Sequence, residues 1–183
     1  MATSPYRNQI QNRNFLSPTG FEFTINKNPK INFFCQTANI PEISLGTAVQ
    51  PSYLKNLDVP GEKLQYSDFT MSFLVDENFE NYMAVHNWLT GLGFPKTPQQ
   101  FEDLTTDNEG ITDKYQEQFS DGSLIVLSSN LRPNFKITFR DLFPVSLSGL
   151  DFDSKLQSEE FFTAQAVFKY SIYEVTNLFG TNL

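Results

Sequence analysis

The chain has a single cysteine, Cys35, and a single histidine, His86, among its 183 residues. One cysteine excludes an internal disulfide and a zinc site built from several cysteines. Any Ser-His or Cys-His catalytic pair would have to use His86. No apolar run is long enough to span a bilayer. Residues 1–14 lack the apolar core of a secretory signal, so the protein is expected to be made and kept in a cytoplasm unless it leaves with a larger particle.

The chain is also poor in charge, with 19% charged residues, and rich in phenylalanine, with 19 copies. Such a composition predicts a folded domain with aromatic side chains to spare for subunit contacts. The net charge of -8 and the pI near 4.6 argue against a nucleic-acid-binding protein, whose binding surface would be basic. The length is enough for one domain with a full core.

Sequence motifs for catalysis and for metal binding are missing. The chain contains no HExxH, no GxGxxG and no P-loop, and Asp107-Asn108-Glu109-Gly110 lacks the rest of an EF-hand. The sequence therefore predicts no catalytic residue, no cofactor site and no metal site, and it predicts that the chain is not an enzyme. We interpret His86 as a packed helix residue and Cys35 as a buried structural thiol. The remaining acidic pairs are assigned to turns or to a helix start: Asp76-Glu77, Asp151/Asp153 and Glu159-Glu160.

The strongest local signal is a strand followed by a helix between Phe69 and Pro95. Alternating apolar residues predict a strand over Phe69–Val75 with one buried face. The period then changes to that of a helix, which we expect Asp76 or Asn78 to cap. Gly91, Gly93 and Pro95 are expected to end it. The predicted apolar side of the helix comprises Phe79, Tyr82, Met83, Val85, Trp88, Leu89 and Leu92, with Glu80, Ala84, Asn87 and Gly91 opposite.

Further strands follow from alternation and turn residues. Phe21–Ile25 and Ile31–Ala38 are expected to form a hairpin around Asn26-Lys27-Asn28-Pro29. The other predicted strands are Leu45–Val49, Ser123–Ser128, Asn134–Arg140 with Phe135, Ile137 and Phe139 inward, Leu142–Leu150 with Phe143, Val145 and Leu147 on one face, and Phe161–Val175 with Phe162, Ala164, Ala166, Phe168, Tyr170 and Ile172 on one face.

Three segments stand apart from this pattern. Residues 1–18 read equally as a disordered tail or as an arm that becomes ordered on a partner. The apolar segment between Pro51 and Gly61 reads equally as an interface loop or as a loop folded back on its own core. Residues 96–121 are interpreted as a surface insertion with one short helix around Asp113–Phe119.

About eight strands and one good helix predict a mainly β (α+β) fold, an antiparallel β-sandwich or barrel with one flanking α-helix. The predicted organisation is a flexible arm over residues 1–18, a single β domain over residues 19–176 that carries the insertion 96–121, and a short tail over residues 177–183.

The stretch from Val59 to Leu89 resembles the tail tube protein family of contractile-tailed bacteriophages. The motif comprises a Pro60-Gly61 turn, the Phe69–Val75 strand, Asp76, and a helix that carries Tyr82 and a late Trp88. Phe33–Gly46 and Phe143–Val175 match the family more loosely. The Asn81-Tyr82 pair and Trp88 also resemble the tube-initiating proteins of the baseplate.

The resemblance implies the tail tube type of β-sandwich and a virion structural protein. Its subunits would form hexameric rings that stack into the tail tube, contact sheath and baseplate proteins, and let DNA pass without specific binding or membrane contact. Assembly would take place in the host cytoplasm. The implied helix and core residues are Asp76, Tyr82 and Trp88. The candidates for contacts between subunits are Tyr53, Leu54, Leu57, Val59, Arg7 and Arg13.

Other functions remain open at the level of sequence. One is a tube-initiator ring at the baseplate, which would share the fold. A different class is a ligand- or carbohydrate-binding β-sandwich, suggested by the surplus of Tyr and Phe and by paired Asp. A hydrolase using His86 or Asp153 is the third alternative.

Overall fold

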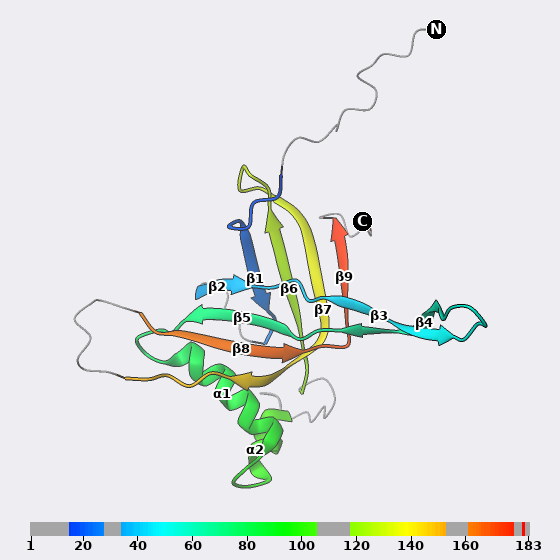
Figure 1. Cartoon of the computed structure of the whole chain (residues 1–183). Coiled ribbons are helices and arrows are strands. Elements are labelled where there is room, and N and C mark those ends of the chain that lie inside the picture. The colour runs from blue at the N-terminus through cyan, green and yellow to red at the C-terminus, as the bar shows by residue number, and fades with distance from the viewer. Residues whose placement is uncertain (1–14, 28–33, 106–117, 153–160, 178–180, 182–183) are drawn as a thin grey trace.

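The structure is a computed structural model that describes residues 15–27, 34–105, 118–152, 161–177 and 181 (Figure 1). These residues form two antiparallel sheets and two helices. The larger sheet has the strand order β1-β6-β7-β8-β5-β2, with β9 also paired to β7, and β3 and β4 form the second sheet. The elements are β1 (Phe21–Ile25), β2 (Cys35–Ala38), β3 (Ile43–Gln50), β4 (Leu57–Tyr66), β5 (Phe69–Leu74), α1 (Glu80–Gly93), α2 (Gln99–Thr105), β6 (Ser120–Leu127), β7 (Pro133–Leu147), β8 (Thr163–Lys169) and β9 (Ile172–Asn177).

The long strand β7 folds the larger sheet into two layers. Up to Leu142 it pairs with β6 and β9, and from Phe143 it pairs with β8. In Figure 1, β1, β6, β9 and the first part of β7 run upright, while β5 and β8 cross them. Asp141 lies at the change of partner with a φ of 54°. The pairing of β6 with β7 shifts register beside Asp141, between Ser120 and Gly122. Such a shift bends a strand and increases its twist, which turns the sheet over its own core.

The core lies between these two layers and against α1. The ring of Phe69 lies 4.8 Å from that of Phe23 and 4.7 Å from that of Phe139. Trp88 of α1 adds its ring 6.2 Å from Phe168. The buried apolar residues are Phe23, Ile25, Phe69, Met71, Phe73, Val85, Trp88, Leu124, Val126, Ile137, Phe139, Leu142, Ala164, Ala166 and Phe168. The predicted mainly β, antiparallel fold with a flanking helix is confirmed.

The predicted hairpin between Phe21–Ile25 and Ile31–Ala38 is wrong. β1 pairs with β6, with Phe23 opposite Leu124, and β2 pairs with β5, with Cys35 opposite Phe73. The two strands stand at opposite ends of the strand order. Turn residues between two strands permit a hairpin, but here pairing with strands far along the chain places Phe23 and Ile25 of β1 in the core and packs Cys35 and Ala38 of β2 against it.

The predicted single strand over Phe161–Val175 is two strands in different layers. Ala164, Ala166 and Phe168 are buried as expected, but the chain turns at Ser171 and Ile172 is exposed. The Ser171 amide donates to the Arg140 carbonyl at the turn.

The opposite error concerns the predicted strands 134–140 and 142–150, which are one strand, β7, ending at Leu147. Ile137 and Phe139 point inward as predicted. The irregularity at Asp141 reverses the parity beyond it, so Leu142 is buried and Val145 is exposed.

Neither Asp76 nor Asn78 caps α1 with its side chain. The residue at the helix start is Phe79, in the left-handed region with φ 62°, and it makes no side-chain cap. Its amide donates to the Asp76 carbonyl at 2.8 Å. The side chain of Asn81, which is 1% exposed, accepts from the Asp76 amide at 3.1 Å and donates to the Leu74 carbonyl at 2.7 Å. The helix is therefore fixed to β5 by a residue inside its first turn.

The buried face of α1 also differs from the predicted one. Val85 and Trp88 are buried with Asn81 and Gly91, the last of which was expected on the opposite side. Met83 and His86 are exposed, so the interpretation of His86 as a packed residue is wrong.

Candidate assembly interface

The β3–β4 hairpin projects from the rest of the molecule (Figure 1). Its pairing runs from Ile43 opposite Tyr66 to Gln50 opposite Leu57, with a shift of register between Leu45 and Thr47. A Cβ atom at Gly61 would lie 2.3 Å from the carbonyl oxygen of Gly46. Only glycine permits this close approach of the two backbones.

The hairpin carries apolar side chains into solvent. Tyr53 is 100% exposed and Leu54 is 90% exposed at its tip. Val59 is half-buried. The other exposed apolar residues on the hairpin are Ile43, Leu45, Val49, Leu57 and Leu64. The alternative that this segment folds back on its own core is therefore wrong, and an exposed apolar surface of this extent is typical of an interface.

Three tyrosines hold the base of the hairpin. The ring of Tyr66 lies 6.1 Å from that of Tyr170 and 5.7 Å from that of Tyr173. The Tyr170 hydroxyl donates to the Ser67 carbonyl at 2.9 Å, and the Tyr173 hydroxyl donates to the Pro41 carbonyl at 3.3 Å. Burial, followed by the neighbouring Tyr173, Tyr66 and Asp68, raises the pKa of Tyr170 to about 12. The hairpin is thus fixed where it leaves the domain.

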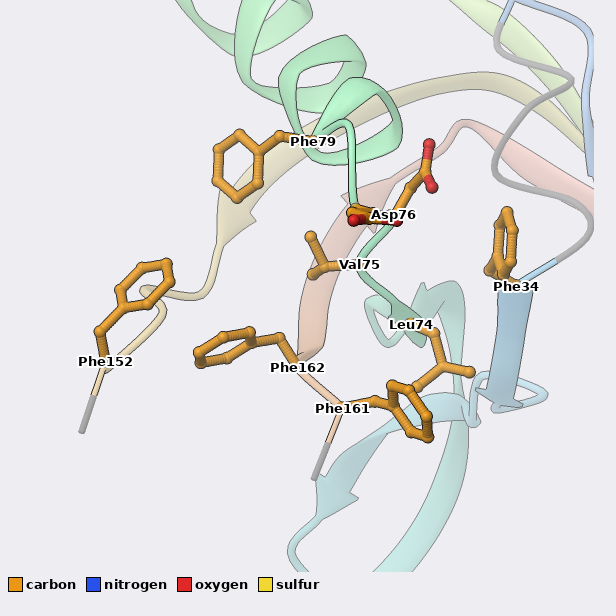
Figure 2. Close-up of a pocket in the computed structure, with 9 residues that line it drawn as sticks. Phe34, Leu74, Val75, Asp76, Phe79, Phe152, Phe161 and Phe162 are labelled. Carbon is orange, nitrogen blue, oxygen red and sulfur yellow. The ribbon is translucent and has the colours of Figure 1, made fainter. Parts of the chain in front are cut away.

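A second apolar feature is a pocket of about 650 Å³ where β5 ends and α1 begins. Figure 2 shows Phe79, Phe152 and Phe162 on one side of the β5 end, and Leu74, Phe161 and Phe34 on the other. Val75, Asp76 and Glu77 are the other described residues that line it. Phe152 and Phe161 are 78% and 79% exposed, so the pocket is open to solvent.

The walls of this aromatic pocket are held by hydrogen bonds and ring contacts. The Val75 amide donates to the Phe162 carbonyl at 2.8 Å. The rings of Phe152 and Phe162 lie 4.7 Å apart, and those of Phe79 and Tyr82 lie 4.6 Å apart. Sequence reasoning did not find this pocket, since its phenylalanines are scattered along the chain. The high phenylalanine content was the only signal for it.

The residues predicted for the helix and core occupy three separate positions. Asp76 lines the aromatic pocket. Tyr82 is half-buried, and its hydroxyl donates to the Ser148 carbonyl at 3.0 Å. Trp88 is 2% exposed, its Nε1 donates to the Gln118 carbonyl at 3.0 Å, and the Lys27 Nζ lies 5.5 Å from the centre of its ring. Arg7 and Arg13 lie outside the described residues, as do Glu159-Glu160, Asp153, residues 107–110 and most of the predicted helix Asp113–Phe119.

The described part of the chain contains no group of three or more His, Cys, Asp and Glu residues that could hold a metal ion. Cys35 is half-buried, and burial raises the pKa of its thiol to about 11, which keeps it protonated and unreactive near neutral pH. Within the same residues, no helix has the length and apolar character needed to cross a membrane.

Comparison with solved structures finds the same fold in contractile assemblies. The cap that terminates the tube of the anti-feeding prophage is 15% identical, with a TM-score of 0.64 over 96% of this chain and 99% of that chain. A chain of the baseplate of the same prophage is 12% identical, with a TM-score of 0.57 over 86% and 91% of the two chains. A chain of the sheath/tube terminator of PVC, an extracellular contractile injection system, is 12% identical, with a TM-score of 0.55 over 88% and 96%.

No protein with a curated description matches this sequence. The family model described as phage tail tube protein matches residues 2–176, nearly the whole chain. With this match, and with a fold shared with chains of the anti-feeding prophage cap and baseplate, the chain belongs to the phage tail tube protein family.

Proposed function

We propose that the chain is a non-enzymatic structural subunit of a phage tail tube, which closes into hexameric rings that stack on one another. The β3–β4 hairpin is the observation that carries this proposal. A monomer gains nothing from holding Tyr53 and Leu54 fully in water, whereas a neighbouring subunit would cover them. Contacts between unlike surfaces of identical subunits close into a ring or continue as a stack.

Two further features support the proposal. The net charge of -8 suits a conduit, because an acidic lumen repels DNA phosphates and lets the genome slide through. The exposed side of α1, with Met83 and His86, offers a surface toward a surrounding sheath. In this proposal the protein resides in the virion tail, binds sheath and baseplate proteins, and uses Arg7, Arg13 and the N-terminal residues as additional contacts between rings.

Negative-stain electron microscopy over a protein concentration series tests the proposal. Rings with six-fold symmetry, or stacked tubes, are expected. Stacks that grow without a partner would identify the main tube protein, and isolated rings would identify an initiator or terminator. A protein that stays monomeric at all concentrations, both alone and with tail partners, would contradict the proposal.

A variant with Tyr53→Ala and Leu54→Ala tests the hairpin directly. Burying two side chains of this size contributes about 3–6 kcal/mol per contact before binding costs. The variant should therefore assemble at least about 100-fold less readily. At a protein concentration where the wild-type chain does not assemble, the melting temperature of the variant should equal that of the wild type, because neither side chain touches the core. The matched control is Met83→Ala, which removes an exposed apolar side chain from α1 and should leave rings intact. Equal assembly of both variants would exclude the hairpin as the main contact.

A further inference from the structure

We propose that the aromatic pocket receives the hairpin tip, Tyr53-Leu54-Lys55, of a second copy of this chain. This proposal rests on the proposed function, and adds to it the surface that accepts the hairpin. Each subunit then carries the inserted element and its receptor, and every contact in the assembly repeats the same pair.

The two surfaces lie at opposite sides of the molecule. In Figure 1 the β3–β4 hairpin extends to the right, whereas the end of β5, the start of α1 and the start of β8 lie to the left. A hairpin therefore cannot reach the pocket of its own chain. Complementary surfaces on opposite sides give a head-to-tail contact, which extends from copy to copy or closes by rotation.

The pocket suits the tip in size and in chemistry. Its volume of about 650 Å³ lies within the range of about 300–1,000 Å³ that is typical of sites that bury a small ligand. Aromatic rings line it, and they pair favourably with a tyrosine ring in tilted or edge-to-face arrangements.

Charge gives the contact a direction. Among the described residues that line the pocket, Asp76 and Glu77 are charged. Lys55 directly follows Tyr53 and Leu54, and it is exposed. An inserted tip brings this ammonium group toward the two carboxylates, which favours one orientation of the tip over its reverse.

Both partners are largely formed before they meet. Hydrogen bonds hold the pocket wall. The Val75 amide donates to the Phe162 carbonyl, and the Asn81 side chain bonds to the Leu74 carbonyl and the Asp76 amide. The hairpin is fixed at its base by Tyr66, packed against Tyr170 and Tyr173. Surfaces ordered in advance lose less conformational entropy when they bind.

Disulfide trapping tests the contact. In a Cys35→Ser background, Lys55→Cys and Glu77→Cys are introduced together, which keeps Tyr53 and Leu54 as anchors. Mild oxidation should join chains head to tail into a ladder on a non-reducing gel. The matched control pairs Lys55→Cys with Ser129→Cys, an exposed position in the turn between β6 and β7. The first pair should give about tenfold more cross-linked product, because thiols held in contact react at a high effective concentration.

Charge reversal is the second measurement. Lys55→Glu should weaken assembly about fivefold, the upper range for an exposed ion pair, and Glu77→Lys in the same chain should restore it. Imaging of a wild-type preparation in parallel separates the proposed tube function from the proposed role of the pocket.

Rings or tubes without a ladder would overturn the pocket as receptor of the hairpin tip and leave the tube function standing. The Phe162→Ala variant tests the pocket itself. If this variant failed to assemble while the cysteine pair gave no ladder, the pocket would bind another segment or partner, and the proposal that it receives the hairpin tip would be overturned. A ladder together with charge rescue supports it.

Discussion

Replacement of Asn81 by alanine should destabilise the protein more than any exposed substitution on α1. Its side chain joins the first turn of the helix to the end of β5 by two hydrogen bonds, to the Asp76 amide and the Leu74 carbonyl. Removing it leaves both backbone groups without that partner at a site where the side chain is 1% exposed.

The size of the effect follows from those two groups. A polar group left unsatisfied in a protein interior costs about 1–3 kcal/mol. Leu74 and Asp76 are half-buried, so water recovers part of that cost, and we take about 1–1.5 kcal/mol for each. The expected loss is about 2–3 kcal/mol of unfolding free energy. For a chain of this length it corresponds to a fall of about 4–12 °C in melting temperature.

Urea unfolding followed by circular dichroism measures this loss, with the assembly-deficient Tyr53→Ala, Leu54→Ala chain as the parent so that association does not contribute. Asn87→Ala is the matched control, because Asn87 is an exposed asparagine on the same helix. It should change stability by less than about 0.5 kcal/mol. If Asn81→Ala changed stability as little as Asn87→Ala, the two hydrogen bonds would not fix the helix to β5, and the reasoning would be refuted.

Two further predictions concern the hairpin and alkaline pH. Gly61→Ala should disrupt the pairing of β3 with β4 and abolish assembly, with little change in the melting temperature of the unassembled chain. Gly46→Ala, whose added Cβ meets only the Lys63 carbonyl at 4.0 Å, should assemble normally. Hydrogen exchange of the hairpin amides distinguishes the two variants, and equal protection in both would contradict the prediction. Burial raises the pKa of Cys35 from 9.0 to about 11 and that of Tyr170 from 10.0 to about 12, so the folded state favours the neutral forms. Their contribution to stability is full below pH 9 and is lost as the pH rises toward 11 and 12. Urea midpoints measured from pH 8 upward should therefore fall, and Cys35→Ala should flatten the curve between pH 9 and 11; an unchanged slope in Cys35→Ala would exclude the thiol as a cause.

Errors of the sequence interpretation share one cause, which is that periodicity reports only local geometry. Alternation found the buried faces of β5 and β8, because burial on one side of a strand requires period two whatever the partner strand is. It could not show that β1 pairs with β6, or that the chain turns at Ser171, since both depend on residues distant in sequence. It also could not show that Asn81 would turn inward, because a polar residue is buried only where backbone groups of another element complete its hydrogen bonds.

The sequence by itself determined the mainly β class, the helix after β5, and the apolar segment around Tyr53 and Leu54, because each depends on side chains near one another along the chain. Tertiary structure alone decided that this segment stands in solvent as a hairpin, with Gly61 against Gly46. It also decided that phenylalanines far apart in the sequence, such as Phe34 and Phe162, line one pocket. Neither feature has a local signature, because each arises where the packing of the larger sheet brings distant segments together or leaves one without cover.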